Sequence, residues 1–197
     1  MAEAVEGRLV ELTAERHRLV IGLAYAAPGN FTGRAIYANT CCLLRREAAQ
    51  GLARAAELAA LCGFRLKVLD AYRPPWAQER LWRHLPDPRY VADAETGSSH
   101  SRGVAVDVTL VDGQGRDLDM GTPFDAMEEP ARHFFPALPP PVQRNRAVLL
   151  GIMTQAGFQA SDTEWWHYQL PGARSYPMLQ DDRVRPAGEG SQPGKEG

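Results

Sequence analysis

The stretch Ser98–Asp107 reads SSHSRGVAVD, a polar turn that runs into an alternating apolar strand. From Gly103 to Leu110, the valines and Leu110 face one side of the predicted strand, and Asp107 faces the other side with Ala105. A carboxylate buried in such a strand is costly unless it has a partner. The pattern therefore predicts a partner close to Asp107.

His100 lies in the same stretch, just before the predicted strand. A neutral imidazole and a carboxylate are both good ligands for Zn²⁺, and a catalytic zinc site has three protein ligands and one open position. His100 and Asp107 are therefore candidate metal ligands. Their spacing is not of the HExxH type, and on spacing alone an arginine or a backbone donor is the simpler partner for Asp107.

The segment Glu164-Trp165-Trp166-His167 offers a third ligand, His167, and a nearby carboxylate, Glu164. Residues three apart in a regular strand point to opposite faces. Both side chains can face one site only if Glu164 lies in a turn before the strand begins, and Ser161-Asp162-Thr163 makes such a turn plausible. The alternative is a core hairpin with both tryptophans inside and the two polar residues at its wet ends.

Arg73 follows a predicted strand over residues 64–68 and the turn residue Asp70. Beside a metal, a guanidinium can stabilise the oxyanion that develops in a tetrahedral intermediate. Without that context, the simpler interpretation is a surface arginine in a turn.

The remaining segments predict a mixture of helices and antiparallel strands. A helix is expected over 42–62, with Gly63 as its stop, a short helix from Pro75 or Trp76, and a helix over 142–156. The turn at 112–115 predicts a hairpin back through Leu118 and Met120, and a last hairpin spans 158–170. We predict one α+β domain, residues 1–180, with a small, mainly antiparallel central sheet flanked by helices, and a disordered tail over 181–197.

Composition excludes several classes of protein. The net charge of −2 gives no basic footprint for nucleic acid and no polybasic patch for a membrane. The N-terminal region lacks the apolar core of a signal peptide, and the three cysteines are odd in number and form no CxxC pair. A cytoplasmic protein with free thiols is therefore expected.

Several motifs together are similar to those of a known family. Besides the two segments above, they are Tyr25 with NFTG at 30–33, DAYRP at 70–74 and MGTPFD at 120–125. The chain resembles the VanX-type zinc D-alanyl-D-alanine dipeptidases, whose superfamily includes D,D-carboxypeptidases and the hedgehog signalling domain. The motifs extend from about Leu23 to His167, and the SxHxxGxAxD and ExWH pair marks the superfamily. The NFTG and MGTPFD segments narrow the resemblance to the dipeptidases.

The resemblance implies one zinc ion per chain and the hydrolysis of D-Ala-D-Ala, a small dipeptide, to two D-alanines. It implies the following roles: zinc ligands His100, Asp107 and His167; general base Glu164; oxyanion stabilisation by Arg73, with Asp70 as its support; substrate contacts Ser98, Asp125 and Tyr25, the last two for the α-amino group. One departure is Ala71, where a glycine is expected.

Two alternatives stay open at this point. A D,D-carboxypeptidase or cell-wall endopeptidase would share the metal motif, although the missing leader and the NFTG and MGTPFD segments argue against it. A non-catalytic zinc module would need neither Glu164 nor Arg73, and both are present. The sequence leaves open the oligomeric state, the range of side chains accepted, and whether the role is antibiotic resistance or D-alanine recycling.

Overall fold

A five-stranded sheet lies at the centre of the computed structural model, which describes residues 9–93 and 95–188. Its strands are, in spatial order, β2 (Val20–Ile21), β4 (Arg65–Asp70), β5 (Ala105–Val111), β7 (His167–Gln169) and β6 (Gln159–Ala160). Only the β2–β4 pair is parallel, and the other three pairs are antiparallel. The predicted α+β fold with a mainly antiparallel sheet is confirmed.

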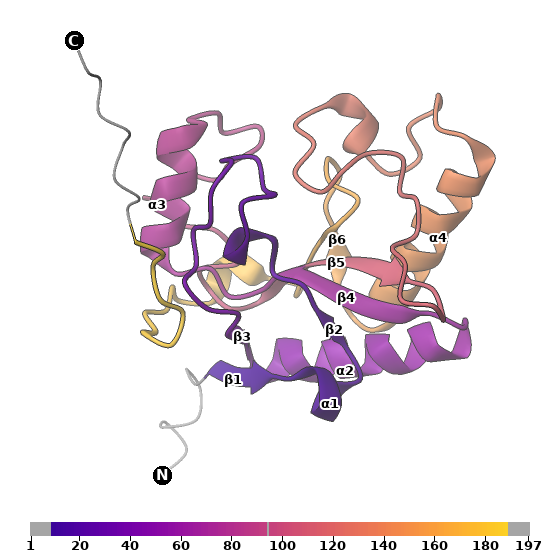
Figure 1. Ribbon diagram of the computed structural model, residues 1–197, viewed down its shortest axis with the longest axis horizontal. Coiled ribbons are helices and arrows are strands. Elements are labelled where there is room, and N and C mark those ends of the chain that lie inside the picture. Colours follow the sequence, from indigo (N-terminus) through magenta and orange to yellow (C-terminus); the bar gives the residue numbers. More distant parts are fainter. Residues whose placement is uncertain (1–8, 94, 189–197) are drawn as a thin grey trace.

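One face of the sheet packs against helices. Figure 1 shows α2 (Arg46–Leu61) running along the sheet, with α4 (Pro140–Gln155) beside it. Alternate side chains of β4 and β5 face α2 and are completely buried, as are the residues of α2 that face the sheet: Leu66, Val68, Val106, Val108 and Leu110 from the strands; Ala48, Leu52, Ala55 and Ala59 from the helix. Because successive strand residues alternate, Asp107 points to the other face, where loops replace the helices.

The prediction of a helix over 42–62 is wrong for its first four residues. Cys42–Arg45 forms strand β3, which pairs antiparallel with β1 (Leu9–Leu12), and α2 begins at Arg46. All four residues of β3 are buried. Strand pairing with a distant segment overrides the helical composition here, because β1 supplies the backbone partners of β3.

The other predicted elements are close to those observed. Helix α3 (Pro75–His84) begins at the expected proline, and α4 begins at Pro140, a residue suited to the first turn of a helix. The chain turns back after β5 as expected, with the backbone nitrogen of Leu118 donating to the carbonyl oxygen of Leu110 over 2.9 Å, but the returning segment forms an isolated bridge, Val111 to Asp117, rather than a strand. The shorter helices are α1 (Ala14–His17), η1 (Ala24–Ala26), η2 (Glu129–Ala131) and η3 (Ala173–Ser175).

Residues 181–188, which the sequence assigns to a disordered tail, lie against the domain. Val184 is 1% exposed, and the backbone nitrogen of Ala38 donates to the carbonyl oxygen of Arg185 over 2.8 Å. The buried side chain of Val184 and this backbone hydrogen bond hold the segment against the domain, although most of its residues are polar. Residues 189–197, the rest of the expected tail, are outside the described residues.

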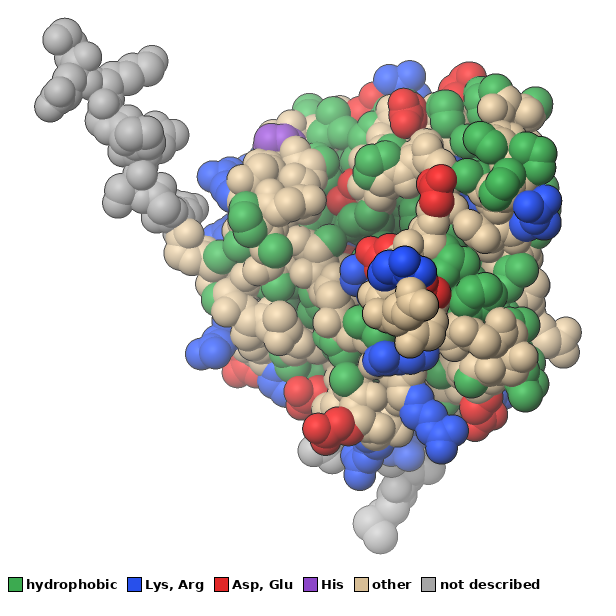
Figure 2. Space-filling view, turned by 45° about the vertical axis from the view of Figure 1, so that its right-hand side comes forward, with side chains coloured by type: hydrophobic (Ala, Val, Ile, Leu, Met, Phe, Trp, Pro, Cys, Tyr) green, Lys and Arg blue, Asp and Glu red, His purple; other side chains and the backbone are tan. Residues whose placement is uncertain are grey.

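The surface carries charges of both signs. On the face drawn in Figure 2, acidic and basic side chains are intermingled, with no large area of a single sign. Within the described residues, no helix combines the length and the apolar character that crossing a membrane requires.

Candidate active site

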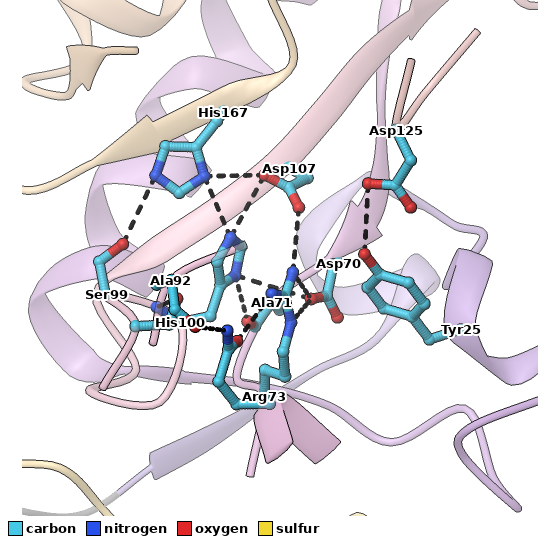
Figure 3. Close-up of polar contacts among 12 residues, drawn as sticks. Tyr25, Asp70, Ala71, Arg73, Ala92, Ser99, His100, Asp107, Asp125 and His167 are labelled. Carbon is cyan, nitrogen blue, oxygen red and sulfur yellow. Dashed lines mark hydrogen bonds and ion pairs between the residues drawn. The ribbon is translucent and has the colours of Figure 1, made fainter. Parts of the chain in front are cut away.

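Three predicted ligands meet on one face of the sheet, where β5 pairs with β7. His100 lies in the turn before β5, Asp107 lies in β5, and His167 is the first residue of β7. Asp107 and His167 are direct partners in the antiparallel register, so the pairing of the two strands brings their side chains together. Figure 3 shows all three pointing at a common centre.

The ligand atoms have the separations that a tetrahedral metal needs. Nε2 of His100 lies 3.1 Å from Nδ1 of His167 and 3.3 Å from Oδ1 of Asp107, and the latter two atoms are 3.0 Å apart. Bonds of about 2.0–2.1 Å to a tetrahedral zinc place neighbouring ligand atoms about 3.3 Å apart. The donor set and its spacing therefore fit zinc, with the fourth position left for water or substrate.

A backbone carbonyl sets the orientation of His100. Its Nδ1 lies 2.7 Å from the carbonyl oxygen of Ala71, which can only accept a hydrogen bond. A neutral His100 therefore carries its proton on Nδ1 and presents the Nε2 lone pair to the cluster, as a metal ligand must. Ala71, the departure from the family pattern, is buried and its φ is not positive, so this turn does not require glycine.

Asp107 is strongly acidic in this setting. Burial alone would raise its pKa, but the adjacent His100 and His167 outweigh burial and hold the pKa well below its usual range. The carboxylate is therefore ionised at neutral pH, the form that binds a metal.

Arg73 is buried rather than at the surface, and a bulge in β4 helps to place it. The register between β4 and β5 shifts at Val68–Asp70, which sets Asp70 opposite Asp107. Arg73 is 8% exposed, and its Nε and Nη2 contact Oδ2 of Asp70 at 2.9 and 2.8 Å. Nη2 also lies 3.6 Å from Oδ2 of Asp107. The guanidinium is thus held directly beside the candidate metal ligands.

Two further residues hold Arg73 and Asp70 in place, and the sequence does not predict either of them. Oε1 of Gln78 accepts from Nη1 of Arg73 over 3.0 Å, and the hydroxyl of Tyr37 donates to Oδ1 of Asp70 over 3.0 Å. Gln78 lies in the first turns of α3, and Tyr37 comes from a loop 33 positions before Asp70. Neither residue stands in a motif with Arg73, and no local signal in the sequence identifies them.

Glu164 lies in a turn, as the sequence predicts, and β7 starts only at His167. The turn is closed by the backbone nitrogen of His167, which donates to the carbonyl oxygen of Glu164 over 3.3 Å. Glu164 therefore faces the same cavity as His167. Burial raises the pKa of the Glu164 carboxyl above its usual value, although His167 opposes this shift.

Asp125 has a strained backbone and one unused oxygen. Its φ is +60°, a left-handed conformation that is uncommon outside glycine, although aspartate tolerates it better than most residues. Oδ1 accepts a hydrogen bond from the hydroxyl of Tyr25 over 3.2 Å, while the buried Oδ2 has no partner among the described residues. Burial, then the nearby Asp107, raises the pKa of Asp125 well above its usual value. Among the residues that the structure describes, no cation contacts this carboxyl, although its ionised form needs one.

One cavity of about 330 Å³ joins these groups. All the predicted site residues except Asp70, which contacts Arg73, are in its wall: Tyr25, Arg73, Ser98, His100, Asp107, Asp125, Glu164 and His167. Ser98 is 7% exposed, and its Oγ accepts from the backbone nitrogen of His100. In Figure 3, Asp125 and Ser99 are on opposite sides of the three ligands. The volume is near the lower end for ligand sites, roughly 300–1,000 Å³, which suits a small ligand.

Comparisons with known proteins point to one family. A family model described as D-ala-D-ala dipeptidase matches residues 6–184. The D-alanyl-D-alanine dipeptidase of Escherichia coli is 49% identical over 173 residues, 88% of this chain and 90% of that protein. The proteins of the same name from Enterococcus faecium and Streptomyces coelicolor are each 34% identical, over 74% of this chain and 83% of their own lengths. The resemblance seen in the motifs is confirmed, and the chain belongs to the D-Ala-D-Ala dipeptidase family of peptidases.

Proposed function

We propose that this protein hydrolyses the free dipeptide D-Ala-D-Ala to two D-alanines, with one zinc ion held by His100, Asp107 and His167. The observation that carries the proposal is the unpartnered Oδ2 of Asp125, buried in the wall of the cavity that also contains the three ligands. A free dipeptide has an ammonium group close to its only peptide bond. The family relationship supports the same substrate.

Zinc, when bound, supplies a Lewis acid that polarises a carbonyl group and makes water more acidic. Glu164 faces the same cavity and takes the proton from the attacking water. Its raised pKa suits this task, because a base works best when its pKa is closer to the working pH. The same carboxyl then gives the proton to the departing amine of the second alanine.

Arg73 stabilises the negative charge that develops on the carbonyl oxygen. Asp70 and Gln78 fix its guanidinium on one side, and this fixed position means that little reorganisation is needed as the charge forms. The stacking of the guanidinium over the ring of Tyr25, 5.0 Å from its centre, further limits its movement.

The two ends of the cavity select the length of the substrate. Asp125, supported by Tyr25, receives the substrate ammonium, and Ser98, also in the cavity wall, contacts another part of the substrate. An N-acyl group would remove the positive charge and leave the buried carboxylate unpaired, which costs roughly 3–5 kcal/mol. This selection would spare longer peptides that end in D-Ala-D-Ala.

We place the activity in the cytoplasm as part of the proposal. The cysteines Cys41, Cys42 and Cys62 are all free, as is usual in a reducing compartment.

A dipeptide panel with and without chelator tests the function. The full chain should release alanine from D-Ala-D-Ala, lose this activity when the metal is removed by chelator, and regain it with added zinc. L-Ala-L-Ala serves as the control for stereochemistry. Efficient release of D-alanine from a pentapeptide, with little action on the dipeptide, would favour the D,D-carboxypeptidase alternative. Full activity in the metal-free protein would contradict the zinc proposal.

A further inference from the structure

Arg146 of α4 is a completely buried charge, with 0% of its surface exposed. Among the described residues it has no carboxylate partner, and its hydrogen bonds go to neutral acceptors only. Burial lowers the pKa of this guanidinium to about 10, despite the opposing influence of Asp119. A buried charge is weak evidence for stability alone, because its desolvation is costly. Its contacts suggest another role.

The guanidinium joins the two ends of one loop. Nε donates to the carbonyl oxygen of Met120 over 2.7 Å, before Asp125 in the chain. Nη1 donates to the carbonyl oxygens of Pro130 and Arg132, after Asp125, over 2.8 and 2.6 Å. Asp125 lies between these anchor points, so one planar group closes the loop that carries it.

The same guanidinium reaches the segment that carries Glu164. Its Nη2 lies 3.3 Å from Oγ1 of Thr122, which also accepts from Nε1 of Trp165 over 2.9 Å. The backbone nitrogen of Trp165 donates to the carbonyl oxygen of Ala131 over 2.9 Å. Because Trp165 directly follows Glu164, the loop of Asp125 and the turn of Glu164 are fixed to one common point.

Close packing leaves this loop little freedom to shift. Gly121 has φ of +81°, and a Cβ added there would lie 2.7 Å from Cγ1 of Val142. Figure 1 shows the loop beside α4, and Asn145 of the same helix donates to the carbonyl oxygen of Asp119 over 2.8 Å.

We propose that Arg146 is a positioning residue that fixes the distance between Asp125 and Glu164, and thereby sets the selection for a short substrate with a free amine. The inference rests on the proposed function of those two residues. Only arginine offers a rigid planar set of five N–H donors that can reach both loop ends at once. Lysine keeps the charge but cannot hold the same acceptors in a fixed plane.

The test compares Arg146→Lys with Arg144→Lys, a matched change at an exposed arginine of the same helix. For each zinc-loaded full-length protein, kcat and KM are measured for D-Ala-D-Ala, and kcat/KM for its N-acetyl derivative. Arg146→Lys should raise KM for the free dipeptide and lower the preference for it over the N-acetyl form by about tenfold or more, because small misplacements of binding groups are costly. Arg144→Lys should behave as wild type.

A purely structural role would reduce the amount of active protein and leave KM and the preference unchanged. A folded Arg146→Lys with wild-type KM and preference therefore overturns the inference. If that variant does not fold, Trp165→Phe carries the test, since it keeps an aromatic ring beside Arg146 but removes the donor to Thr122, and it should also weaken the preference. An unchanged preference in Trp165→Phe would then overturn the inference.

The failure of the inference and the failure of the proposed function can be told apart. Wild-type protein that cuts both substrates equally contradicts the proposed function itself. A selective wild type with unchanged variants contradicts only the role of Arg146.

Discussion

Asp107 and His167 face each other across the β5–β7 pair, with Oδ1 of the aspartate 3.0 Å from Nδ1 of the histidine. Backbone pairing fixes this contact, so the two proposed ligands are already in place for a metal. His100 is added from the turn before β5 and is oriented by the carbonyl oxygen of Ala71. A preformed site of this kind favours tight metal binding.

Loss of either histidine ligand should therefore remove the metal. We expect wild type to hold one zinc per chain, and His100→Ala and His167→Ala to hold far less after dialysis, because two protein ligands bind zinc weakly. Metal analysis of the purified proteins measures this, with His84→Ala, an exposed histidine of α3, as the control. Full zinc content in both ligand variants would refute the site.

Glu164→Gln should keep the fold and the zinc and lose most of the turnover. The amide has the same shape but cannot take a proton, and general acid–base catalysis is worth about 10²–10⁴-fold. Steady-state kinetics together with metal analysis test this. A fall in kcat of less than about tenfold would show that another group handles the proton.

Arg73→Ala should lower kcat more than it raises KM. The guanidinium acts mainly on charge that appears in the transition state, so its loss affects the chemical step. The measurement is the separate determination of kcat and KM for D-Ala-D-Ala. A change in KM alone would assign Arg73 to the binding of the ground state instead.

Substrate binding should weaken in acid because of Asp125. Burial raises the pKa of this carboxyl, and only its ionised form attracts an ammonium. As the pH falls through that raised pKa, KM for the dipeptide should rise. In Asp125→Asn, KM should be higher throughout and should not show this rise. A wild-type KM that is constant into the acid range would contradict the assigned role.

Gly103→Ala should destabilise the protein. Gly103 has φ of +70°, and an added Cβ would lie 2.6 Å from Cδ2 of Leu9. Left-handed backbone in a residue other than glycine costs about 1–3 kcal/mol. Gly113→Ala, where nothing lies within 4 Å and φ is not positive, is the control and should change stability little. Denaturant unfolding compares the two, and equal stabilities would contradict the packing described here.

The sequence singles out His100, Asp107 and His167 as candidate metal ligands because they stand in short motifs, within or beside patterned strands, that resemble those of the family. If Glu164 and His167 are to face one site, the two-residue period of a strand requires Glu164 to precede the strand, and in the structure β7 begins only at His167. The strand at Cys42–Arg45 was missed because its partner, β1, is 30 or more positions away and its own composition favours a helix.

The sequence does not predict the three residues that support the site, because their roles depend on contacts with other segments of the chain. Gln78, Tyr37 and Arg146 act through contacts with loops, and loop conformations leave no periodic pattern in the sequence. Arg146 in particular stands in an otherwise ordinary helix, where an arginine is usually exposed. Its burial comes from the loop over 120–132, whose backbone carbonyl oxygens accept its hydrogen bonds.

The most direct test of the central claim compares kcat/KM for three substrates in wild type and Asp125→Ala. The substrates are D-Ala-D-Ala, N-acetyl-D-Ala-D-Ala and a pentapeptide ending in D-Ala-D-Ala. We expect wild type to prefer the free dipeptide by about 10²–10³ or more, the equivalent of one lost buried charge partner, and Asp125→Ala to lose most of that preference. Comparable cleavage of all three substrates by wild type, or an intact preference in Asp125→Ala, would contradict the claim that Asp125 recognises the free amine of a dipeptide.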